Sequence, residues 1–281
     1  MISLPAAALF AGILGLVAGI RPGAAQERPS EEALRAIEAA GRRIAGYHEA
    51  VARARERFQK QAPDMAPSTR FVVVDRHGAW RVIVMRPVEG EAGAKGWQMQ
   101  AEIGFNPKAG EVTTIERFNP PRQAPSDALG VQHAIEAASA IISLHVAEAK
   151  APFQEAAFKE PDKTFVVYLQ PATERSTAAR FGSDLLANVS GDGMKVLKAR
   201  AMHRAAAWVP VPSSATGEPT LHSHIEGEMP TETDLAVVIE HPGLAPHLVL
   251  TPRHMFRIDE AGVITYLGPN QVPPASPGGA R

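Results

Sequence analysis

The chain has 281 residues, of which 45% are hydrophobic and 21% charged, so it can bury the core of one large domain or two ordinary ones. Its 29 basic and 30 acidic side chains leave a formal net charge of -1, which gives no electrostatic footprint for nucleic acid or for an acidic membrane surface. Cysteine is absent, which excludes disulfides, iron–sulfur clusters, thiolate zinc sites and a cysteine nucleophile, so any metal must be held by histidine and carboxylate.

The first 25 residues have the pattern of a secretory signal peptide. An apolar run from Ala6 to Ile20 stops at Arg21, and the small residues at 23–25 precede Gln26. A membrane anchor is the alternative, but a span needs ~20 apolar residues and this run supplies about 15. We therefore expect residues 1–25 to be a signal peptide, the mature form to have no membrane span, and the location to be periplasmic or secreted.

Residues 30–120 are expected to form a small α+β domain. Apolar residues recur at helical spacing from Leu34 to Phe58, and Ser30 is a suitable N-cap for this helix. Two β-hairpins follow, with turns at 77–78 and 106–110. The sequence predicts an N-terminal helix plus an antiparallel β-meander, followed by a proline-rich linker at 119–130.

Residues 126–268 are expected to form a second domain, and residues 269–281 a disordered tail. The pattern predicts a helix from about Ser126 to Ala149, a buried strand over 164–171, and a hairpin with its turn at 191–193. A short helix over 231–241 and two or three closing strands complete the unit. The fold class predicted for the whole chain is α+β.

Most of the chemistry that the sequence offers lies in its histidines, because the phosphate-binding, dinucleotide-binding, GxSxG and HExxH motifs are absent. Six histidines fall in the last third of the chain, and His222 and His224 are the closest pair. Alternate residues of a strand share one face, so both rings can approach one ion. Asp234 begins the following helix and can supply a carboxylate. Two imidazoles and one carboxylate leave a fourth zinc position for water, as in catalytic sites.

His222-x-His224 followed by Thr231-x-x-Asp234 resembles the JAMM motif of the MPN-domain (JAB-like) metalloproteases. The resemblance covers about residues 150–268 and implies an MPN/JAB-like α/β sandwich. It implies that Zn²⁺ is held by His222, His224 and Asp234, and that Thr231 supports the reacting groups at a catalytic site. The function implied is zinc-dependent hydrolysis of peptide or isopeptide bonds in an exported protein, with an unidentified peptide or protein as substrate or partner.

Four departures from that motif leave alternatives open. Six residues instead of seven separate His224 from Thr231, threonine replaces serine, and Ile225 stands where the family has proline. The general-base glutamate has no match, since Glu160 and Glu174 only flank the strand at 164–171. A catalytically inactive JAB-like binding module is therefore the alternative function, and a histidine pair that binds no metal is another.

A second metal motif competes for the same histidines. His222-x-His224-x-x-x-Glu228 has the HxHxxxE spacing of the first cupin motif, but the later histidine motif of cupins is missing. We rank this reading below the JAMM resemblance. The remaining histidines His241, His247 and His254 are interpreted as helix-end, surface or core polar residues.

Overall fold

The computed structural model describes most of the chain between residues 28 and 271. The described ranges are 28–76, 78–89, 95–146, 152–172, 177–203, 205–212 and 218–271. The signal peptide expected at 1–25 lies outside them, as does most of the expected tail at 269–281. No helix of the described part is long and apolar enough to cross a membrane.

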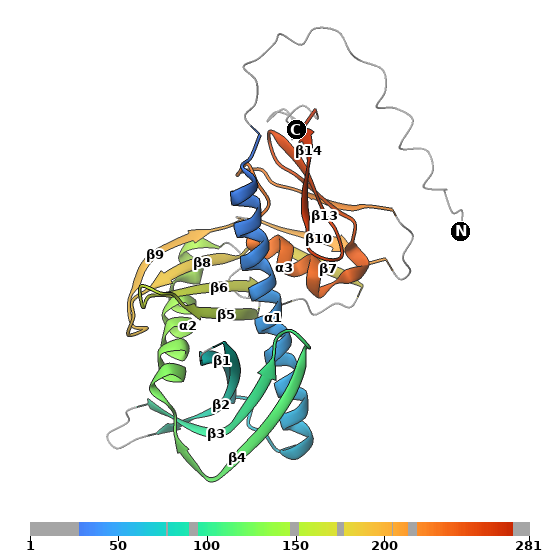
Figure 1. Ribbon diagram of the computed structural model, residues 1–281. Coiled ribbons are helices and arrows are strands. Elements are labelled where there is room, and N and C mark those ends of the chain that lie inside the picture. The colour runs from blue at the N-terminus through green and yellow to red at the C-terminus, as the bar shows by residue number, and fades with distance from the viewer. Residues whose placement is uncertain are drawn as a thin grey trace, which may run out of the picture.

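One long helix, α1 (Glu31–Gln61), runs past all the sheets of the molecule (Figure 1). Its 31 residues correspond to about 46 Å at 1.5 Å per residue. The Ser30 side chain accepts a hydrogen bond from the Ala33 amide at 3.1 Å, and Glu31 and Glu32 lie in the first turn, where carboxylates are favoured. The helix predicted from the apolar spacing is confirmed.

Four strands after α1 form an antiparallel sheet in the order β1-β2-β3-β4, which is the predicted meander. The strands are β1 (Arg70–Arg76), β2 (Ala79–Glu89), β3 (Lys95–Asn106) and β4 (Glu111–Gln123). The linker predicted at 119–130 is wrong, because β4 continues to Gln123 and the next helix begins at Ser126. Pro120 and Pro121 are compatible with β4 since it is an edge strand, where a missing N–H need not break a ladder.

A second antiparallel sheet has the order β5-β6-β8-β9 and is covered by the helix α2. These elements are α2 (Ser126–His145), β5 (Phe153–Lys159), β6 (Phe165–Pro171), β8 (Leu185–Val189) and β9 (Val196–Ala201). The predicted turn at 191–193 joins β8 to β9, and Gly193 has the positive φ of 78° that the turn requires.

The remaining elements gather at the N-terminal end of α1. They are β7 (Ala178–Gly182), β10 (Ala206–Pro210), β11 (Thr220–Ser223), α3 (Glu232–Glu240), a 3-10 turn (Pro242–Leu244), β12 (His247–Leu250), β13 (His254–Ile258) and β14 (Ile264–Pro269). Strands β7 and β10 pair with each other, and the other four have the order β11-β12-β13-β14. The β11–β12 pair is parallel and the rest are antiparallel, so β11, α3 and β12 form a crossover unit.

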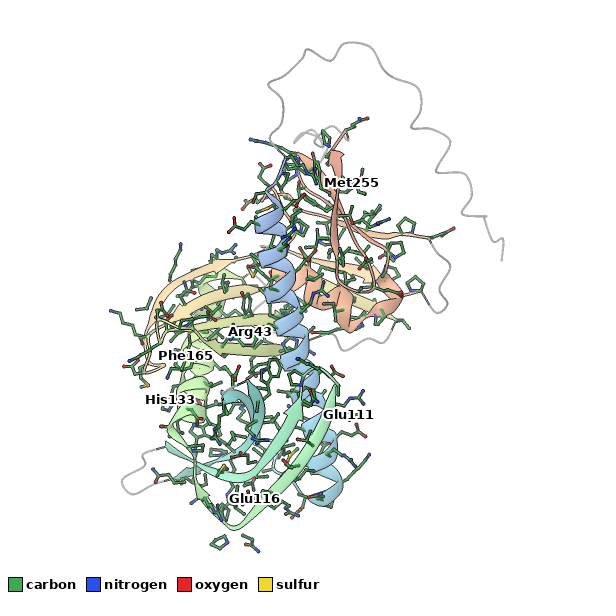
Figure 2. The ribbon with its side chains drawn as sticks, viewed as in Figure 1. Arg43, Glu111, Glu116, His133, Phe165 and Met255 are labelled. Carbon is green, nitrogen blue, oxygen red and sulfur yellow. The ribbon has the colours of Figure 1, made fainter. Side chains whose placement is uncertain are left out.

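The apolar cores do not follow the expected division between 30–120 and 126–268. One cluster joins β1, β2 and β3 to α2, β6 and β8. A second joins α1 to the first sheet, to β5 and β6, and to Ala236 of α3. A third joins the start of α1 to β7, α3, β12 and β13. Side chains fill the space between these layers, as Figure 2 shows around Phe165 and Arg43. The helix α1 therefore contributes to the second and third clusters, and α2 contributes to the first.

Candidate metal centre

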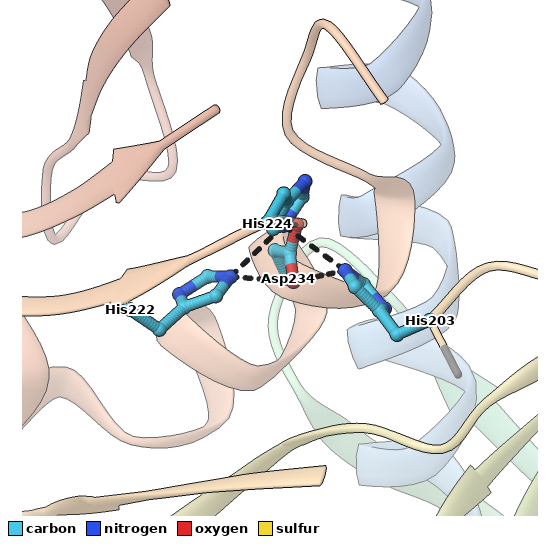
Figure 3. A group of neighbouring side chains, drawn as sticks. All are labelled: His203, His222, His224 and Asp234. Atoms are coloured by element: carbon cyan, nitrogen blue, oxygen red, sulfur yellow. Dashed lines mark hydrogen bonds and ion pairs between the residues drawn. The ribbon is translucent and has the colours of Figure 1, made fainter. Parts of the chain in front are cut away.

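Three histidines and one aspartate converge on a single point where β11, α3 and the segment between β9 and β10 meet (Figure 3). The four residues are His203, His222, His224 and Asp234. The Nε2 atom of His224 lies 3.0 Å from Nε2 of His203 and 3.0 Å from Nε2 of His222. The Asp234 carboxylate lies 3.0 Å from His224, 3.2 Å from His222 and 3.4 Å from His203. We call these four residues the histidine–aspartate group.

The spacing of these donor atoms matches a small tetrahedral ion. With metal–ligand bonds of about 2.0–2.1 Å, the ligand atoms of a tetrahedral zinc site lie about 3.3 Å apart. Five contacts among the four residues, three of them to one or the other Asp234 oxygen, measure 3.0 to 3.4 Å, and all four ligand atoms lie within 4.8 Å of one another. Three imidazole nitrogens and one carboxylate oxygen are also a donor set that zinc accepts. The group can therefore hold a metal ion with four protein ligands.

Strand β11 brings His222 and His224 onto the same side. His222 lies opposite Val249 in the parallel β11–β12 pair, and the His224 amide donates to the Leu250 carbonyl at 2.7 Å just beyond the strand end. Because alternate residues of an extended chain share a face, both rings point toward α3. The side chains are 2% and 1% exposed, so the pair is removed from water. The sequence predicted this arrangement of the pair.

The cap of α3 holds Asp234 in place. Asp234 accepts a hydrogen bond from the Thr231 amide at 2.7 Å, and the Asp234 amide donates to the Thr231 hydroxyl at 3.2 Å, which is a capping box. The Asp234 Oδ1 atom is buried and accepts no well-formed hydrogen bond among the described residues, although the Nε2 atoms of His222 and His203 lie 3.2 Å and 3.4 Å from it. An unsatisfied buried carboxylate oxygen is costly, and a metal ion at the centre of the group would satisfy it.

Thr231, for which the JAMM resemblance implies a catalytic role, occupies the N-cap position of α3. Its hydroxyl accepts from the Asp234 amide and lies 2.9 Å from the Thr233 hydroxyl. It therefore orients the aspartate through the helix cap.

His203 reaches the group from the segment that follows β9. Its Nδ1 atom lies 2.8 Å from Oδ1 of Asp184, and its amide donates to the same oxygen at 3.0 Å. The Thr233 hydroxyl donates to the other oxygen of Asp184, which is 1% exposed. Gly182 has a φ of 81°, and a Cβ there would collide with the Ala205 carbonyl, so this glycine allows the segment to approach. With the Nδ1–H donated to Asp184, the Nε2 atom of His203 faces the group, where a metal ion would replace the proton that it carries.

A hydrogen-bond relay fixes His222 in the same way. The Thr220 hydroxyl donates to the Leu244 carbonyl at 2.5 Å, so it must accept from Nδ1 of His247, which lies 2.6 Å away. The Nε2 of neutral His247 is then an acceptor for Nδ1 of His222 at 2.7 Å. This leaves the His222 Nε2 lone pair facing the group. The Phe181 ring stacks on both imidazoles, at 4.4 Å from His222 and 4.7 Å from His247.

The electrostatics of the group agree with these roles. Burial raises the pKa of the Asp234 carboxyl, but the imidazoles of His203, His224 and His222 outweigh it and hold that pKa well below its ordinary value. Burial opposes the charged form of His203, yet Asp234 and Asp184 raise its pKa to about 9. Burial and the neighbouring His222 lower the pKa of His247 to about 3, so His247 is neutral. The carboxylate is therefore ionised and available to a cation.

The structure brings His222, His224 and Asp234 together, as the sequence predicted, and adds His203 as a fourth member. No motif in the sequence links His203 to the pair His222 and His224. The sequence indicates only that His203 follows the second strand of the hairpin predicted around 191–193. Asp184 accepts from His203, and His247 accepts from His222, so both support the group; from the sequence alone, His247 is interpreted only as a surface or core polar residue.

The glutamates that the sequence analysis considered as ligand or general base lie outside the histidine–aspartate group or outside the described residues. Glu228, needed for a cupin-like site, lies 3.2 Å from Arg253 and 3.7 Å from His254. Glu160, a flanking candidate for the general base, pairs with Arg43 at 2.9 Å, while Glu174 lies outside the described residues. No glutamate of the described chain belongs to the histidine–aspartate group.

Comparisons with known proteins assign no family to the chain. No protein-family model matches it, and no curated protein matches it. Among solved structures, the β-propeller domain of Nup133 from Vanderwaltozyma polyspora aligns with 76% of this chain at 10% identity and a TM-score of 0.15. The alignment spans 42% of that domain's chain, and a likeness this low carries no argument about fold or function.

Proposed function

We propose that the protein binds one divalent transition-metal ion, best fitted by Zn²⁺, through His203, His222, His224 and Asp234. The observation that carries the proposal is that one ligand atom from each of the four residues lies within 4.8 Å of the other three, with several of these contacts at 3.0–3.4 Å. Soft thiolate ligands are absent from the sequence, and square-planar copper would need a flatter arrangement. Four protein ligands give a closed coordination shell, which is the pattern of structural zinc sites.

The bound metal would join three parts of the fold that are separate in the sequence. His203 follows β9, His222 and His224 belong to β11 and its end, and Asp234 begins α3. Metal binding energy is then added directly to the stability of this region. The proposed role is that of a metal-dependent binding module, which is the alternative function expected from the missing general base.

Zinc-dependent hydrolysis of peptide or isopeptide bonds by a divergent JAMM-type site is the second candidate. One observation favours it: the side chain of His203 is 11% exposed, against 1% for His224 and Asp234 and 2% for His222. Release of this outermost ligand would open a coordination position for water, as catalysis requires. The resemblance of 222–234 to the JAMM motif supports this candidate, and the missing glutamate counts against it.

Metal analysis of the purified full chain tests the proposal. We expect one zinc ion per chain in the wild type and about none in His224→Ala. His145→Ala is the matched control, because it removes an exposed imidazole at the end of α2 outside the group. Cobalt substitution should give the intense visible bands of tetrahedral Co²⁺. A wild type that binds no zinc would overturn both candidate functions.

Cleavage of labelled casein by the zinc-loaded wild type separates the two candidates. A closed structural site predicts no cleavage of fluorescein-labelled casein by the zinc-loaded wild type, and weaker zinc binding in His203→Ala. A hydrolase predicts cleavage by the wild type that is abolished in His222→Ala and by chelators.

The compartment is part of the same proposal. The apolar run at 6–20 followed by small residues supports export to the periplasm or the medium. N-terminal sequencing of the mature protein is the test, with cleavage close to residue 25 as the expected result. A mature protein that begins at Met1 would contradict it.

A further inference from the structure

A cavity of about 550 Å³ lies where the edges of two sheets face each other. Strand β1 is the outer strand of the first sheet and β5 is the outer strand of the second, and no pairing between the described strands joins these two sheets. The cavity is lined by parts of β1, β5, α1 and α2. Its volume falls in the range of about 300–1,000 Å³ that is usual for small-molecule sites.

One carboxylate faces this cavity without a partner. Glu155 extends from β5, and within the described part of the chain it forms no hydrogen bond or ion pair. Burial raises the pKa of its carboxyl, while the charges of Arg70, Arg55 and His48 act in the opposite sense. A largely buried carboxyl group that lacks such a partner is stabilised by any ligand that brings it a positive charge or a hydrogen-bond donor.

Two guanidinium groups line the same cavity. Arg55 on α1 lies over the Phe71 ring at 5.3 Å from its centre, and Arg70 begins β1. Both side chains are exposed, and among the described residues neither lies within ion-pair distance of a carboxylate. Opposite charges therefore share one cavity without touching, which leaves room for a ligand that carries both.

The remaining wall combines apolar and aromatic side chains with polar ones, among them Glu136, which accepts a hydrogen bond from Gln132 at 2.9 Å. Phe71, Trp97 and Phe153 line the cavity together with Ile135 of α2. Such surface favours burial of an apolar group at ~25 cal/mol per Å². The cavity thus offers an anionic point, a cationic rim and an apolar wall.

We propose that this cavity binds a small zwitterion, an α-amino acid or a short peptide with an apolar side chain. Its ammonium group pairs with Glu155, its carboxylate with Arg55 and Arg70, and its side chain packs against Phe71, Trp97 and Phe153. The site is distinct from the histidine–aspartate group, since none of those four residues lines the cavity. The proposal therefore stands whether or not the protein binds zinc.

Calorimetric titration of the full chain with four ligands tests it. The ligands are L-phenylalanine, the dipeptide L-alanyl-L-phenylalanine, N-acetyl-L-phenylalanine, which lacks the ammonium group, and L-phenylalaninamide, which lacks the carboxylate. We expect one of the two zwitterions to bind with a Kd below about 1 mM, and both blocked compounds to bind about tenfold more weakly or worse. The better of the two zwitterions identifies the source as a free amino acid or a peptide.

Two variants locate the binding. Glu155→Gln should weaken L-phenylalanine and its amide, and Arg70→Gln should weaken L-phenylalanine and its N-acetyl form, each by about tenfold. Arg35→Gln is the control, since it removes an exposed guanidinium of α1 that does not line the cavity. If Glu155→Gln fails to fold, Arg70→Gln and the blocked ligands decide. Absence of zwitterion binding, or equal binding of the N-acetyl form, overturns the proposal.

Discussion

Replacement of Gly41 by alanine tests the close crossing between α1 and the helix that carries Asp234. A Cβ atom at this position would lie 2.7 Å from Cβ of Leu235, 2.7 Å from its Cδ2 and 2.8 Å from the carbonyl oxygen of Glu232. Contacts this short force a shift, and the backbone carbonyl cannot rotate away. The helix α3 must therefore move away from α1 in the variant.

The expected magnitude follows from two opposing effects. Overpacking of a well-packed core costs about 1–3 kcal/mol, whereas alanine in place of glycine in a helix gains about 1 kcal/mol. Gly46 on the same helix provides the matched comparison, because its added Cβ would meet only the Trp80 ring, at 3.4 Å and 3.5 Å. Gly46→Ala keeps the helix gain and avoids the clash. The two variants should thus differ in free energy of unfolding by about 1–3 kcal/mol.

Urea denaturation of the metal-free proteins measures this difference, and a competition titration gives the zinc affinity. We expect Gly41→Ala to be less stable than Gly46→Ala and to bind zinc more weakly, because Asp234 moves with α3. Equal stability of the two variants would refute the reasoning, since it would mean that the helices do not cross this closely.

Three further predictions concern the two sites. His247→Phe keeps a ring for Phe181 to stack on but removes the acceptor of the His222 Nδ1–H, so zinc affinity, measured against a chromogenic chelator, should fall about 10–100-fold; unchanged affinity would show that the relay is dispensable. Zinc at about 1,000 times its Kd should add about 4 kcal/mol of stability and raise Tm by about 8–16 °C in scanning calorimetry, an increase that chelators reverse and His224→Ala lacks. A Tm that ignores both zinc and chelator would contradict the site. Glu155→Gln should match the wild type in stability at pH values below the ordinary glutamate pKa and become the more stable protein as pH rises through the raised pKa of Glu155, since only the wild type must then ionise a buried group. Urea midpoints across this pH series measure it, and a constant gap at every pH would contradict the ionisation argument.

The helices and hairpins could be predicted because their signals are local. The apolar stripe of α1, the Ser30 cap and the glycine turn at 191–193 each depend on neighbouring residues. The prolines of β4 were misread because their tolerance depends on β4 being an edge strand, which is a property of the whole sheet. The sharing of apolar clusters between the two halves of the chain likewise has no local signature.

The candidate metal centre shows the same limit. The HxH spacing and the helix start at Thr231 predicted the convergence of His222, His224 and Asp234. His203 lies 21 residues from His224 in the sequence, and its approach depends on the left-handed conformation of Gly182 and on Asp184. A fourth donor would change the chemistry of a bound metal, because it would fill the position that three ligands leave open to water. That change could not be anticipated from the motif.

The course of α1 has a consequence for how the chain folds. Arg42 donates to the Gly262 carbonyl and Glu38 accepts from the Ile264 amide, contacts that span 220 and 226 residues. At about 5–20 residues per second, the ribosome reaches the second partner roughly 10–45 s after the first. Pairings this distant in sequence also slow folding, because a large loop must close before they form. Leu34 and Ile37 of the α1 stripe share an apolar cluster with Ile258 and Ile264, so this part of the stripe stays uncovered until that distant segment has been made.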